Sequence, residues 1–563
     1  MSKKILIIGS VAAGASSAAR LRRLDEKADI IMFEMGPYMS YANCGLAYAV
    51  GKVIADIDFL LVQTPEEFNE RFNVDVRINN EAVKIDRHKK EVHIHDLQTG
   101  RKYTETYDKL ILAPGAEPVV PAIDGIDSKR VFTIKTIPDT ERIKSFIETE
   151  KPKKALIIGA GYIGLEMAEN LARLGISVGI IEALNQPLAF LDAEMSNIIS
   201  KHLVSKNVAL WLGEKVLSIK ESKSGLTAKL SSGSELDCDF VVCAAGVRPR
   251  TELANDAGLA IGKTGGIKVD EYLRTNDHDI YAAGDAIETA DTVLGMPRLN
   301  MLAGPANKQG RIAADNICGR NVKYKTAPST AIVNIFELTA ATTGANETQL
   351  RQCSIPYEKI YLHPFHHGTY YPGAKQMSIK LLFSKPDGRI LGAQIVGREG
   401  VDKRIDIIAT AIYAGQTVFD LQNLELAYAP QYGSAKDPIN MAGFAAANSL
   451  DGTVDIKHIS GLEDSDFVLD VRTLPEAKKG MIPKAVHIPL DELRSNLTGL
   501  PKDRTIYVYC GTGLRSYIAA RILKQNGFDV KNLPGGYMTY MSNQGVNPTS
   551  PELQSLRAVF LAG

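Results

Sequence analysis

The sequence lacks several features that would indicate a membrane or nucleic-acid protein. No apolar run approaches the roughly 20 residues that a membrane helix requires. There is no surplus of charge, because 65 Lys and Arg balance 65 Asp and Glu among 563 residues. A dedicated binder of nucleic acid or anionic membranes normally shows a basic surplus. The N-terminus enters a strand directly, without an apolar signal segment and cleavage site, so we expect a cytoplasmic protein.

Cysteine is also scarce, and the six cysteines are scattered without the paired spacing of a disulfide framework or a zinc site. The rest of the composition, 45% hydrophobic and 23% charged, is ordinary for a globular protein. At roughly 150 residues per domain, the length predicts three or four domains. We therefore expect a multi-domain enzyme.

Two segments share one pattern: a strand, a glycine-rich turn, a helix and a second strand. The first spans residues 5–34, with Gly9 and Gly14 in its turn, and the second spans residues 155–182. Each has an apolar first strand and an acidic residue at the end of the second strand. Two such units on one chain predict two dinucleotide sites.

The second unit carries the complete glycine pattern. Gly159 permits the tight turn, Gly161 lets the backbone approach a pyrophosphate, and Gly164 allows close packing of helix on strand. Glu182 ends the next strand, where a carboxylate accepts from a ribose 2′-hydroxyl but repels a 2′-phosphate. Because residues 183–185 supply no Arg for that phosphate, the unit predicts NADH over NADPH.

The first unit departs from the pattern, since Val11 stands where the middle glycine would be. Gly9, Gly14 and Glu34 keep the other positions. A later segment, residues 280–285, delivers Asp285 at the end of a buried strand. This segment resembles the second flavin signature of flavoproteins with two dinucleotide folds, whose Asp hydrogen-bonds the ribityl chain. We therefore expect FAD in the first unit.

Segments 110–116 and 241–246 are similar to the linking strands of the same flavoproteins. The resemblance implies further contacts to both cofactors. For FAD these are Ala113 and Gly115, and for NADH they are Tyr162 and Gly246.

A lone thiol, Cys44, follows the first unit within residues 40–45. Disulfide reductases of this superfamily carry a second cysteine five positions later, where this sequence has Ala49. Chemistry at Cys44 would then use a mixed disulfide with the substrate or an oxidised sulfur on this residue. A buried structural cysteine is the alternative.

The first 445 residues resemble the coenzyme A-disulfide reductases, a single-cysteine branch of the pyridine nucleotide–disulfide oxidoreductases. The matching segments are residues 9–16, 40–45, 305–311, 370–373, 427–430 and 436–438. The resemblance implies that Cys44 alternates between a thiol and a mixed disulfide with coenzyme A (CoA). It also implies a homodimer in which the third domain of one subunit closes the active site of the other.

Tyr370 and Tyr428 resemble the family's pair of tyrosines that reaches the substrate thiol across the dimer. A phenol there could donate a proton to a departing thiolate. Tyr371 is the rival to Tyr370, and packing in a Pro/Gly turn is the alternative role.

CoA carries a 3′-phospho-ADP head and a thiol, so its site needs cations at one end. Ser16, Arg20 and Arg23 lie at three- and four-residue spacing on one face of the first helix. A solvated helix face is the alternative. Further candidates for the pantetheine and the head group are Ser40, Asn43, Arg71, Lys308 and Lys436.

A histidine cluster, His363, His366 and His367, is the obvious metal candidate. No Cys or carboxylate motif accompanies it, and Pro364 disrupts a helical display, so we expect no metal site. A flavin peroxidase relative would place a His in the first glycine loop, where Ala12 and Ala13 stand, which disfavours peroxide as substrate.

Cys510 follows an apolar strand and opens a loop that leads into a helix. Backbone N–H groups in such a loop form an anion cradle that stabilises a persulfide anion. With residues 467–472, 480–489 and 533–536, the loop resembles the rhodanese domain. Its Arg lies one position earlier than the C-x5-R phosphatase loop requires, which favours sulfane sulfur over phosphate. The loop continues with Gly511, Thr512, Gly513, Leu514, Arg515 and Ser516.

The expected fold class is α/β with two Rossmann-like domains, an α+β dimerisation domain and a C-terminal rhodanese domain. Antiparallel strands at 377–383 and 390–396, a helix near 404–413 and a linker at 447–452 are expected in the second half. Rhodanese strands are expected at 467–470 and 505–509. The predicted domains are 1–150 with 245–325 (FAD), 151–244 (NADH), 326–446 (dimerisation) and 452–563 (rhodanese).

Together these features predict a homodimeric reductase that uses FAD and NADH to reduce CoA persulfide, polysulfide or CoA disulfide at Cys44. Hydrosulfide and CoA would be the products, and Cys510 would deliver sulfane sulfur. CoA could be free or tightly bound, and we expect no nucleic-acid or membrane partner. The alternatives are a CoA-disulfide reductase that maintains the thiol pool, an NADH oxidase, and a persulfide sensor or carrier without turnover.

Overall fold

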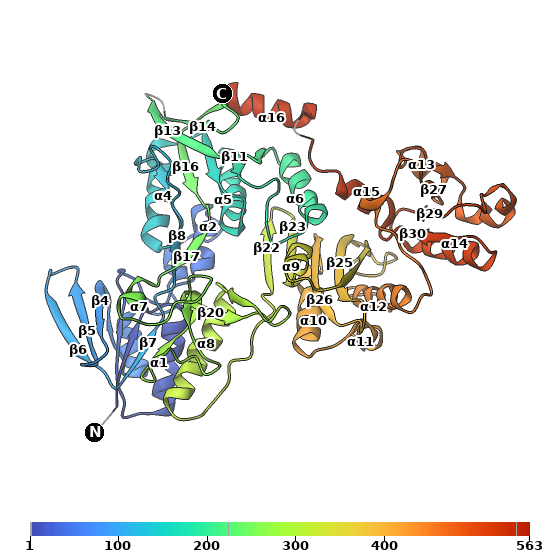
Figure 1. Cartoon of the computed structure of the whole chain (residues 1–563). Helices are drawn as coiled ribbons and strands as arrows, with labels where there is room; N and C mark the ends of the chain where they lie inside the picture. Colours follow the sequence, from blue (N-terminus) through green and yellow to red (C-terminus); the bar gives the residue numbers. More distant parts are fainter. Residues whose placement is uncertain (1–2, 223–224, 548, 563) are drawn as a thin grey trace. The chain divides into compact units, whose positions relative to one another are not determined.

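The computed structural model describes residues 3–222, 225–547 and 549–562. The described chain forms two compact units, coloured by sequence in Figure 1. The first unit comprises Met1–Ala183 and Glu214–Ala327, and the second comprises Leu184–Gly213 and Pro328–Gly563. The division into four domains is finer than this and stays a prediction.

The first unit contains two parallel sheets, and both glycine turns lie in strand–helix–strand units as predicted. The strands of these sheets are β1 (Lys4–Ile8), β2 (Asp29–Phe33), β3 (Asp75–Arg77), β7 (Lys109–Leu112), β9 (Val131–Phe132), β10 (Lys154–Ile158), β11 (Ser177–Glu182), β16 (Phe240–Cys243) and β19 (Ile280–Ala282). One sheet has the order β19-β7-β1-β2-β3, and the other includes β11-β10-β16-β9. Both dinucleotide folds are therefore Rossmann-like.

Shorter strands and the helices complete this unit. The strands are β4 (Asn80–Asp86), β5 (Glu91–Asp96), β6 (Lys102–Thr106), β8 (Ala116–Pro118), β13 (Val216–Ser222), β14 (Gly225–Leu230), β15 (Glu235–Cys238), β17 (Val247–Pro249), β18 (Ile267–Lys268), β20 (Ile287–Ala290) and β21 (Pro297–Leu299). The helices are α1 (Ala12–Leu24), α2 (Leu46–Val50), α3 (Pro65–Phe72), α4 (Ile137–Glu150), α5 (Tyr162–Arg173), α7 (Glu252–Asp256) and α8 (Ala303–Ile317).

Helices α1 and α8 cross closely, which small residues make possible. A Cβ on Gly310 would lie 2.2 Å from the carbonyl oxygen of Ala13. The Ser17 hydroxyl donates to the Gly310 carbonyl at 3.0 Å. The Ala- and Ser-rich sequence of α1 thus fixes the helix that follows the first glycine turn against α8.

The second unit is built around a five-stranded antiparallel sheet and a four-stranded parallel sheet. Its strands are β12 (Ala209–Leu212), β22 (Ala331–Ile335), β23 (Leu338–Gly344), β24 (Tyr357–Leu362), β25 (Met377–Ser384), β26 (Ile390–Gly397), β27 (Phe467–Asp470), β28 (Val486–His487), β29 (Ile506–Tyr509) and β30 (Val530–Asn532). Its helices are α6 (Ala193–Ser205), α9 (Glu347–Gln352), α10 (Val401–Tyr413), α11 (Val418–Asn423), α12 (Pro438–Leu450), α13 (Leu474–Ala477), α14 (Leu514–Gln525), α15 (Gly536–Asn543) and α16 (Pro551–Ala562).

The antiparallel sheet has the order β22-β23-β26-β25-β24, which confirms the predicted strands at 377–383 and 390–396. All eight residues of β25 and of β26 are buried. The polar positions Ser378 and Lys380 therefore do not form a solvated face, although apolar and polar residues alternate there. Helix α10 confirms the helix expected near 404–413.

The C-terminal sheet has the order β28-β27-β29-β30, with all pairs parallel, and its strands at 467–470 and 506–509 match the expected rhodanese strands. The prediction of a linker at 447–452 is wrong over its first four residues, because α12 continues to Leu450. Ala446 and Ala447 are buried, so the apolar face of the helix outweighs the polar residues that suggested a loop.

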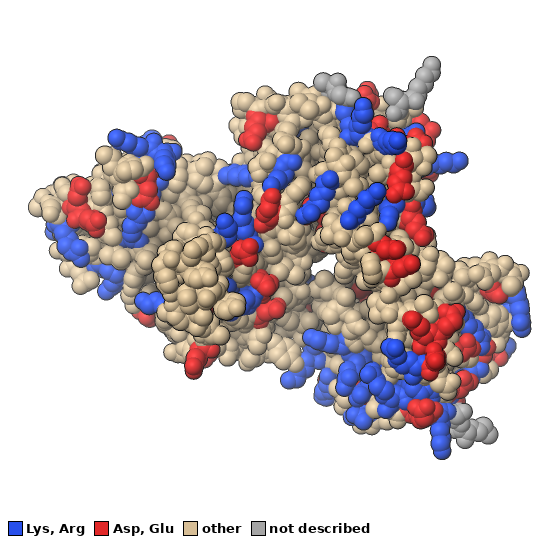
Figure 2. Space-filling model, turned by 180° about the vertical axis from the view of Figure 1, so that it is seen from behind, with Lys and Arg blue, Asp and Glu red and all other residues tan. Residues whose placement is uncertain are grey.

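Charges of both signs are interspersed over the face shown in Figure 2, with Lys and Arg gathered most densely over the lower part of the first unit. This local grouping coexists with a formal net charge of zero. Among the described residues, no helix is both long enough and apolar enough to cross a membrane.

Candidate active site

The first glycine turn lies where β1, α1 and the segment after β7 meet. A Cβ on Gly9 would lie 2.0 Å from the Ala113 carbonyl oxygen, and one on Gly14 would lie 1.8 Å from the Gly9 carbonyl oxygen. Gly9 also has φ +95°, a conformation that L side chains rarely adopt. Any side chain at these positions would force the turn open. The space around Gly115 is free within 4 Å, which leaves room for a ligand.

The second turn repeats this arrangement. A Cβ on Gly159 would lie 2.3 Å from the Ala244 carbonyl oxygen, and one on Gly164 would lie 2.1 Å from the Gly159 carbonyl oxygen. Gly161, the residue before α5, has nothing within 4 Å of its Cβ position, and the same holds for Gly246. The open backbone at the start of α5 fits a pyrophosphate, because helix N-terminal N–H groups bind anions.

The acidic residues predicted to bind ribose lie beside their turns. Glu34 accepts from the Ser10 hydroxyl at 2.8 Å and from the Gly36 N–H at 3.0 Å. Glu182 accepts from the Ala160 N–H at 2.7 Å. Both carboxylates are therefore held at the turn by hydrogen bonds.

Asp285 follows β19 and lies 3.7 Å from the Lys135 ammonium. Burial raises the pKa of the Asp285 carboxyl, and Lys135 opposes that rise. Lys135 was not among the residues predicted from the sequence. It is 150 positions from Asp285, and no local pattern marks such a pair.

Cys44 lies in a short turn of 3-10 helix, Asn43–Gly45, directly before α2. The Ser40 N–H donates to the Ser10 carbonyl at 3.1 Å, which ties this segment to the first glycine turn. Cys44 is exposed. The surrounding protein nevertheless raises the pKa of its thiol, chiefly by partial burial and secondly by the Glu166 carboxylate, while Lys135 lowers it.

Glu166 of α5 and Tyr48 of α2 form a second pair that the sequence did not reveal. The Tyr48 hydroxyl donates to Glu166 at 3.2 Å. Burial raises the pKa of Glu166 to about 7, and the Tyr48 hydrogen bond opposes that rise. A carboxyl group that titrates near neutral pH therefore acts on the Cys44 thiol.

The residues predicted to bind CoA in the first unit differ in their surroundings. Arg20 pairs with Asp315 at 2.7 Å, and Ser16 donates to Asn307 of α8 at 2.5 Å. Arg23 is exposed at the end of α1. Ser40 and Asn43 flank the Cys44 turn, and Arg71 and Lys308 are exposed on α3 and α8. Of the predicted cations of this unit, Arg23, Arg71 and Lys308 are therefore accessible, whereas Arg20 is paired.

The two predicted tyrosines meet in the second unit. The hydroxyl groups of Tyr370 and Tyr428 lie 2.5 Å apart, and the side chains are 73% and 49% exposed. This hydrogen bond raises the pKa of Tyr370. Tyr371 instead packs its ring edge-on against His367, with 5.7 Å between ring centroids. Lys436 is exposed in the same unit.

The C-terminal loop surrounds Cys510, which is buried at the end of β29. The Gly513 N–H donates to the Cys510 sulfur at 3.1 Å. Arg515, a loop residue in the first turn of α14, forms two hydrogen bonds with Glu476, at 2.6 and 2.7 Å. The Ser516 hydroxyl donates to the Gly513 carbonyl at 3.0 Å. Gly511, Thr512 and Leu514 complete the loop, and Leu514 is exposed.

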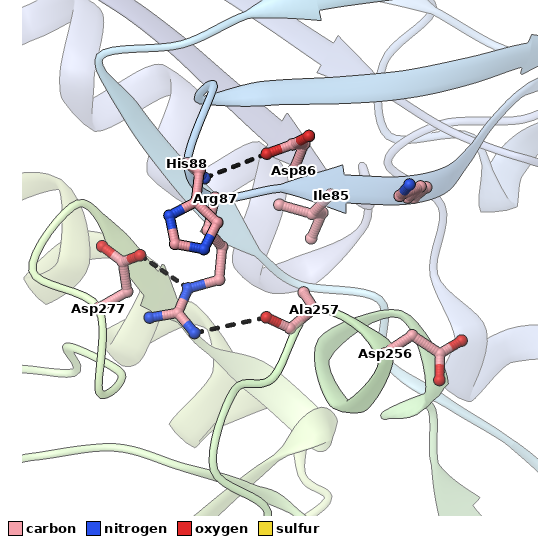
Figure 3. Close-up of a pocket in the computed structure, with 8 residues that line it drawn as sticks. Ile85, Asp86, Arg87, His88, Asp256, Ala257 and Asp277 are labelled. Atoms are coloured by element: carbon pink, nitrogen blue, oxygen red, sulfur yellow. Dashed lines mark hydrogen bonds and ion pairs between the residues drawn. The ribbon is translucent and has the colours of Figure 1, made fainter.

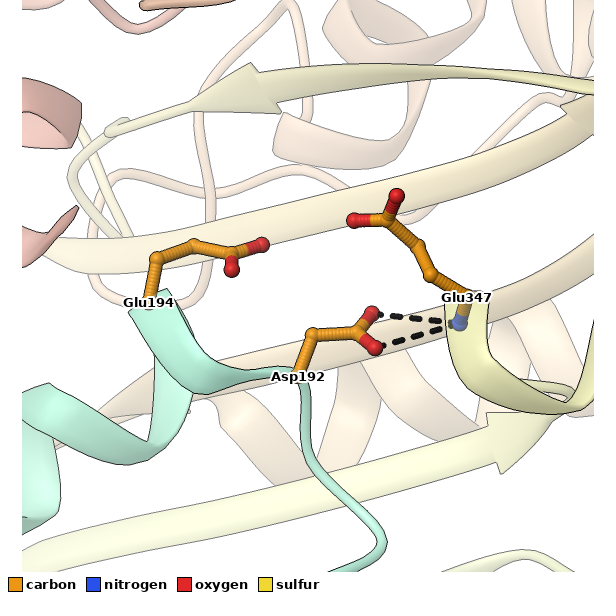
Figure 4. Close-up of side chains that lie close together, drawn as sticks. All are labelled: Asp192, Glu194 and Glu347. Carbon is orange, nitrogen blue, oxygen red and sulfur yellow. Dashed lines mark hydrogen bonds between the residues drawn. The ribbon is translucent and has the colours of Figure 1, made fainter. Parts of the chain in front are cut away.

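Three buried carboxylates of the second unit, Asp192, Glu194 and Glu347, face one another in Figure 4. The Lys380 ammonium lies among them, 2.7 Å from Asp192 and 2.5 Å from Glu347, and also bonded to Glu194. Burial alone would lower the pKa of Lys380, but the carboxylates hold it above its ordinary value. The lysine thus occupies the position that a cation would take.

The histidine cluster is divided between different partners. His363 is buried between Ser378 and Thr539, at 2.9 Å from each hydroxyl, and burial lowers its pKa to about 4. His366 bonds to the backbone of Lys375, and His367 bonds to the Gly368 carbonyl. These bonds use ring nitrogens that a metal would need.

A pocket of about 380 Å³ in the first unit is lined by residues 84–88, Asp256, Ala257 and Asp277. Figure 3 shows its one arginine, Arg87, bonded to the Asp277 carboxylate, at 2.9 Å, and to the Ala257 carbonyl. Because this guanidinium is already paired, Arg87 itself offers little to an anionic ligand.

Comparisons with known proteins agree with this architecture. Residues 3–310 match the family described as pyridine nucleotide-disulphide oxidoreductase, and residues 330–437 match its dimerisation domain. The chain belongs to this oxidoreductase family. Residues 456–543 match the rhodanese-like domain. The predicted fold class is confirmed, and so are FAD and NADH as the cofactors of this oxidoreductase.

Three relatives of this oxidoreductase are similar over most of their length. A coenzyme A disulfide reductase of Staphylococcus haemolyticus is 34% identical over 445 residues, which is 79% of this chain and 99% of the relative. The structure of reduced CoADR-RHD from Bacillus anthracis is 47% identical, with a TM-score of 0.95 over 96% of this chain and 98% of that one. A NAD-dependent persulfide reductase from A. fulgidus is 39% identical, with a TM-score of 0.90 over 95% and 100%.

Proposed function

We propose that this oxidoreductase reduces CoA persulfide or polysulfide, and also CoA disulfide, at Cys44. One observation carries the proposal: Cys44 is a free thiol beside the first glycine turn, and Ala49 stands where a second redox cysteine would be. A lone thiol cannot store two electrons as an internal disulfide, so it has to form a mixed disulfide with its substrate. The names of the similar proteins support a CoA thiol or a persulfide as that substrate.

The chemistry divides between the cofactors and the side chains of the chain. FAD and NADH, held at the turns of Gly9 and Gly159, supply the two electrons when bound. The Cys44 thiolate attacks the CoA-bound sulfur of the persulfide, so that a Cys44–CoA disulfide forms, the persulfide S–S bond breaks and hydrosulfide leaves with the electron pair. Two electrons and one proton then return Cys44 to a thiolate and release CoA.

The surrounding side chains have distinct tasks in this proposal. Arg23 and Lys308, exposed on α1 and α8, attract the phosphates of CoA. The Tyr370–Tyr428 pair donates a hydrogen bond to the departing thiolate from the partner subunit of a homodimer. The matched dimerisation domain supports this assembly. NADH is preferred over NADPH because Glu182 stands at the ribose position.

The rhodanese domain delivers sulfane sulfur in this proposal. Cys510 takes a sulfur atom from polysulfide or another donor and passes it to the CoA thiol, which forms the persulfide that Cys44 reduces. The buried position of the thiol and the Gly513 N–H bonded to its sulfur support a stabilised persulfide anion.

The test is anaerobic NADH oxidation with CoA persulfide and CoA disulfide at equal concentrations, read as kcat/KM. We expect the persulfide to exceed the disulfide by at least tenfold, with one hydrosulfide released for each NADH consumed. A higher kcat/KM for CoA disulfide would make the protein a thiol-pool reductase and remove the proposed role of Cys510. Fast NADH oxidation in air without a sulfur substrate would indicate an oxidase instead.

A further inference from the structure

The loop around Cys510 has a single cationic side chain, Arg515, among residues 511–516. Its guanidinium forms a two-pronged ion pair with Glu476, with N–O distances of 2.6 and 2.7 Å. This geometry engages both carboxylate oxygens, and such paired bonds are the stronger form of an arginine–carboxylate contact. The positive charge next to the thiol is therefore already balanced.

Glu476 is held in place from its other side. It also accepts hydrogen bonds from the Thr473 N–H at 3.0 Å and the Thr473 hydroxyl at 2.7 Å, at the start of α13. The Arg515 hydrogen bonds, aided by Thr473, lower the pKa of Glu476 to about 2. The carboxylate therefore stays ionised and in position throughout the physiological pH range.

The ion pair lies directly beside the loop and faces solvent. A Cβ on Gly511, the residue after Cys510, would lie 3.3 Å from an Arg515 nitrogen and 3.6 Å from a Glu476 oxygen. The side chains of Arg515 and Glu476 are 33% and 38% exposed. A sulfur donor that approaches the loop therefore meets both charges, not the cation alone.

A second arginine, Arg472, whose guanidinium lies over the ring of Tyr509, is balanced in the same way. Arg472 donates to Asp470 at 2.6 Å, and Asp470 also accepts from the Tyr509 hydroxyl at 2.7 Å. The two arginines and two carboxylates, Arg472, Arg515, Asp470 and Glu476, sum to zero charge. These four side chains together offer an incoming anion no net positive charge, whereas the Gly513 N–H already lies on the Cys510 sulfur.

We propose that the Glu476–Arg515 ion pair selects the sulfur donor of Cys510, favouring persulfides with at most one negative charge at the reacting end over dianions such as thiosulfate. A dianion needs Arg515 and is repelled by Glu476, whereas a persulfide end needs only the backbone N–H groups. Glu476 acts through Arg515 and is a positioning residue.

The transfer step balances with either donor. The Cys510 thiolate attacks the outer sulfur of a persulfide R–S–SH, the new S–S bond forms on Cys510, and R–S⁻ leaves with the electron pair and takes its proton from water. With thiosulfate the same attack releases sulfite. The two reactions differ in the charge that the loop must accommodate. The ion pair selects between the donors by this difference in charge.

The test measures sulfur loading of Cys510 in the full-length protein without NADH, with CoA persulfide or thiosulfate as the donor. The readout is the mass of the Cys510 peptide, increased by one sulfur atom, with Cys510→Ser as the blank. We expect Glu476→Gln to raise the thiosulfate-to-persulfide ratio of loading rates by about tenfold, the effect of one charged hydrogen bond. Arg515→Gln should lower this ratio.

The two variants are expected to shift the ratio in opposite directions. This distinguishes selection from a structural effect, because damage to the loop would slow loading from both donors. Asp503→Asn is the matched control. Asp503 pairs with Arg504 at 3.9 Å just before β29, whose other end carries Cys510. The Asp503→Asn substitution removes one carboxylate from an exposed ion pair with an arginine and should leave the ratio of loading rates unchanged.

The inference rests on the proposed role of Cys510 as a sulfur acceptor, and the outcomes distinguish the two. If neither donor loads Cys510 in the wild type, the proposed delivery of sulfur fails, and the selection by the ion pair fails with it. If Cys510 is loaded but Glu476→Gln and Arg515→Gln shift the ratio in the same direction or leave it unchanged, only the selection is overturned.

Discussion

The two thiols of this oxidoreductase lie in opposite surroundings. Cys44 is exposed, and the nearby carboxylates Glu166 and Asp285 add to the partial burial that raises its pKa. Cys510 is buried, with the Gly513 N–H on its sulfur and the Arg515 side chain beside its loop. The same functional group is thus exposed in one case and, in the other, buried with a backbone N–H on its sulfur.

The surroundings of each cysteine, and not the thiol itself, therefore determine the chemistry that it suits. A thiol with a raised pKa needs help to ionise and suits a site where reducing equivalents arrive with the cofactor. A buried thiol that accepts a backbone N–H suits a sulfur atom that stays attached between two transfers. We therefore expect substitutions at the two sites to change different measured properties.

Replacing each of the two thiols by serine, one at a time, should change the rate of NADH oxidation most clearly. Cys44→Ser should lower kcat for NADH-dependent reduction of CoA disulfide by about 10³-fold or more, because no other thiol can form the mixed disulfide. Cys510→Ser should leave this rate within about twofold and abolish only sulfur loading. Steady-state NADH oxidation with CoA disulfide measures the rate of each variant, and the mass of the Cys510 peptide after incubation with a sulfur donor measures sulfur loading.

Cys318→Ser controls for the loss of a thiol, because Cys318 lies after α8 and has no assigned role. It should match the wild type in both assays. A Cys44→Ser variant that kept a substantial rate would show that the electrons bypass the lone thiol.

A smaller effect is expected from the backbone that encloses Cys510. Gly536 has φ +54°, and its Cβ would lie 2.2 Å from the Cys510 carbonyl oxygen. Gly536→Ala should therefore destabilise the rhodanese domain by about 3 kcal/mol through strain and overlap. Hydrogen exchange of peptides from residues 506–543 measures this loss locally.

Gly527→Ala is the matched control, since Gly527 has φ +78° but nothing within 4 Å of its Cβ position. Its cost should be about 1 kcal/mol, from the backbone conformation alone. Equal destabilisation by the two variants would mean that the close approach to Cys510 contributes nothing.

A smaller change is expected in the pH dependence of Cys44 alkylation. Above pH 7 the Glu166 carboxyl is ionised and raises the Cys44 pKa, whereas below pH 7 it is mostly protonated and neutral. Glu166→Gln should therefore leave the alkylation rate of Cys44 unchanged at pH 6 and increase it at pH 8. The midpoint of the rate against pH should move down by about 0.5 unit.

Glu148→Gln serves as the control, because Glu148 is exposed and pairs with Lys52 at 3.5 Å. It should reproduce the wild-type pH profile. A shift of equal size in both variants would assign the effect to net charge, not to Glu166.

Local patterns explain why much of the fold and the site could be predicted. The glycines of both turns, Glu34 and Glu182 lie within single strand–helix–strand units, and the sequence alone dictates the turn and the strand that follows. The Cys510 loop is equally local, because strand, loop and helix follow one another. The family resemblance supplied the pairing of Tyr370 with Tyr428, which spacing could not have given.

Contacts between distant segments explain what the sequence could not reveal. The Lys135–Asp285, Tyr48–Glu166 and Glu476–Arg515 pairs join residues that no short pattern connects. Lys380 lies in a strand whose residues alternate between apolar and polar, yet it is buried, and three carboxylates from other elements surround its ammonium. The stretch after Ala447 looked like a linker, yet the packing of α12 extends the helix through it.

The last helix, α16, returns from the rhodanese end of the second unit to the segment Leu184–Gly213. Arg557 donates to the Leu210 carbonyl, and the Phe560 ring packs edge-on against Trp211. A gene shortened before α16 would leave Trp211, the protein's one tryptophan, without this covering. This helix lies beyond the rhodanese-like residues 456–543. A rhodanese module transplanted onto another reductase would therefore be cut before α16, so that α16 stays with Trp211.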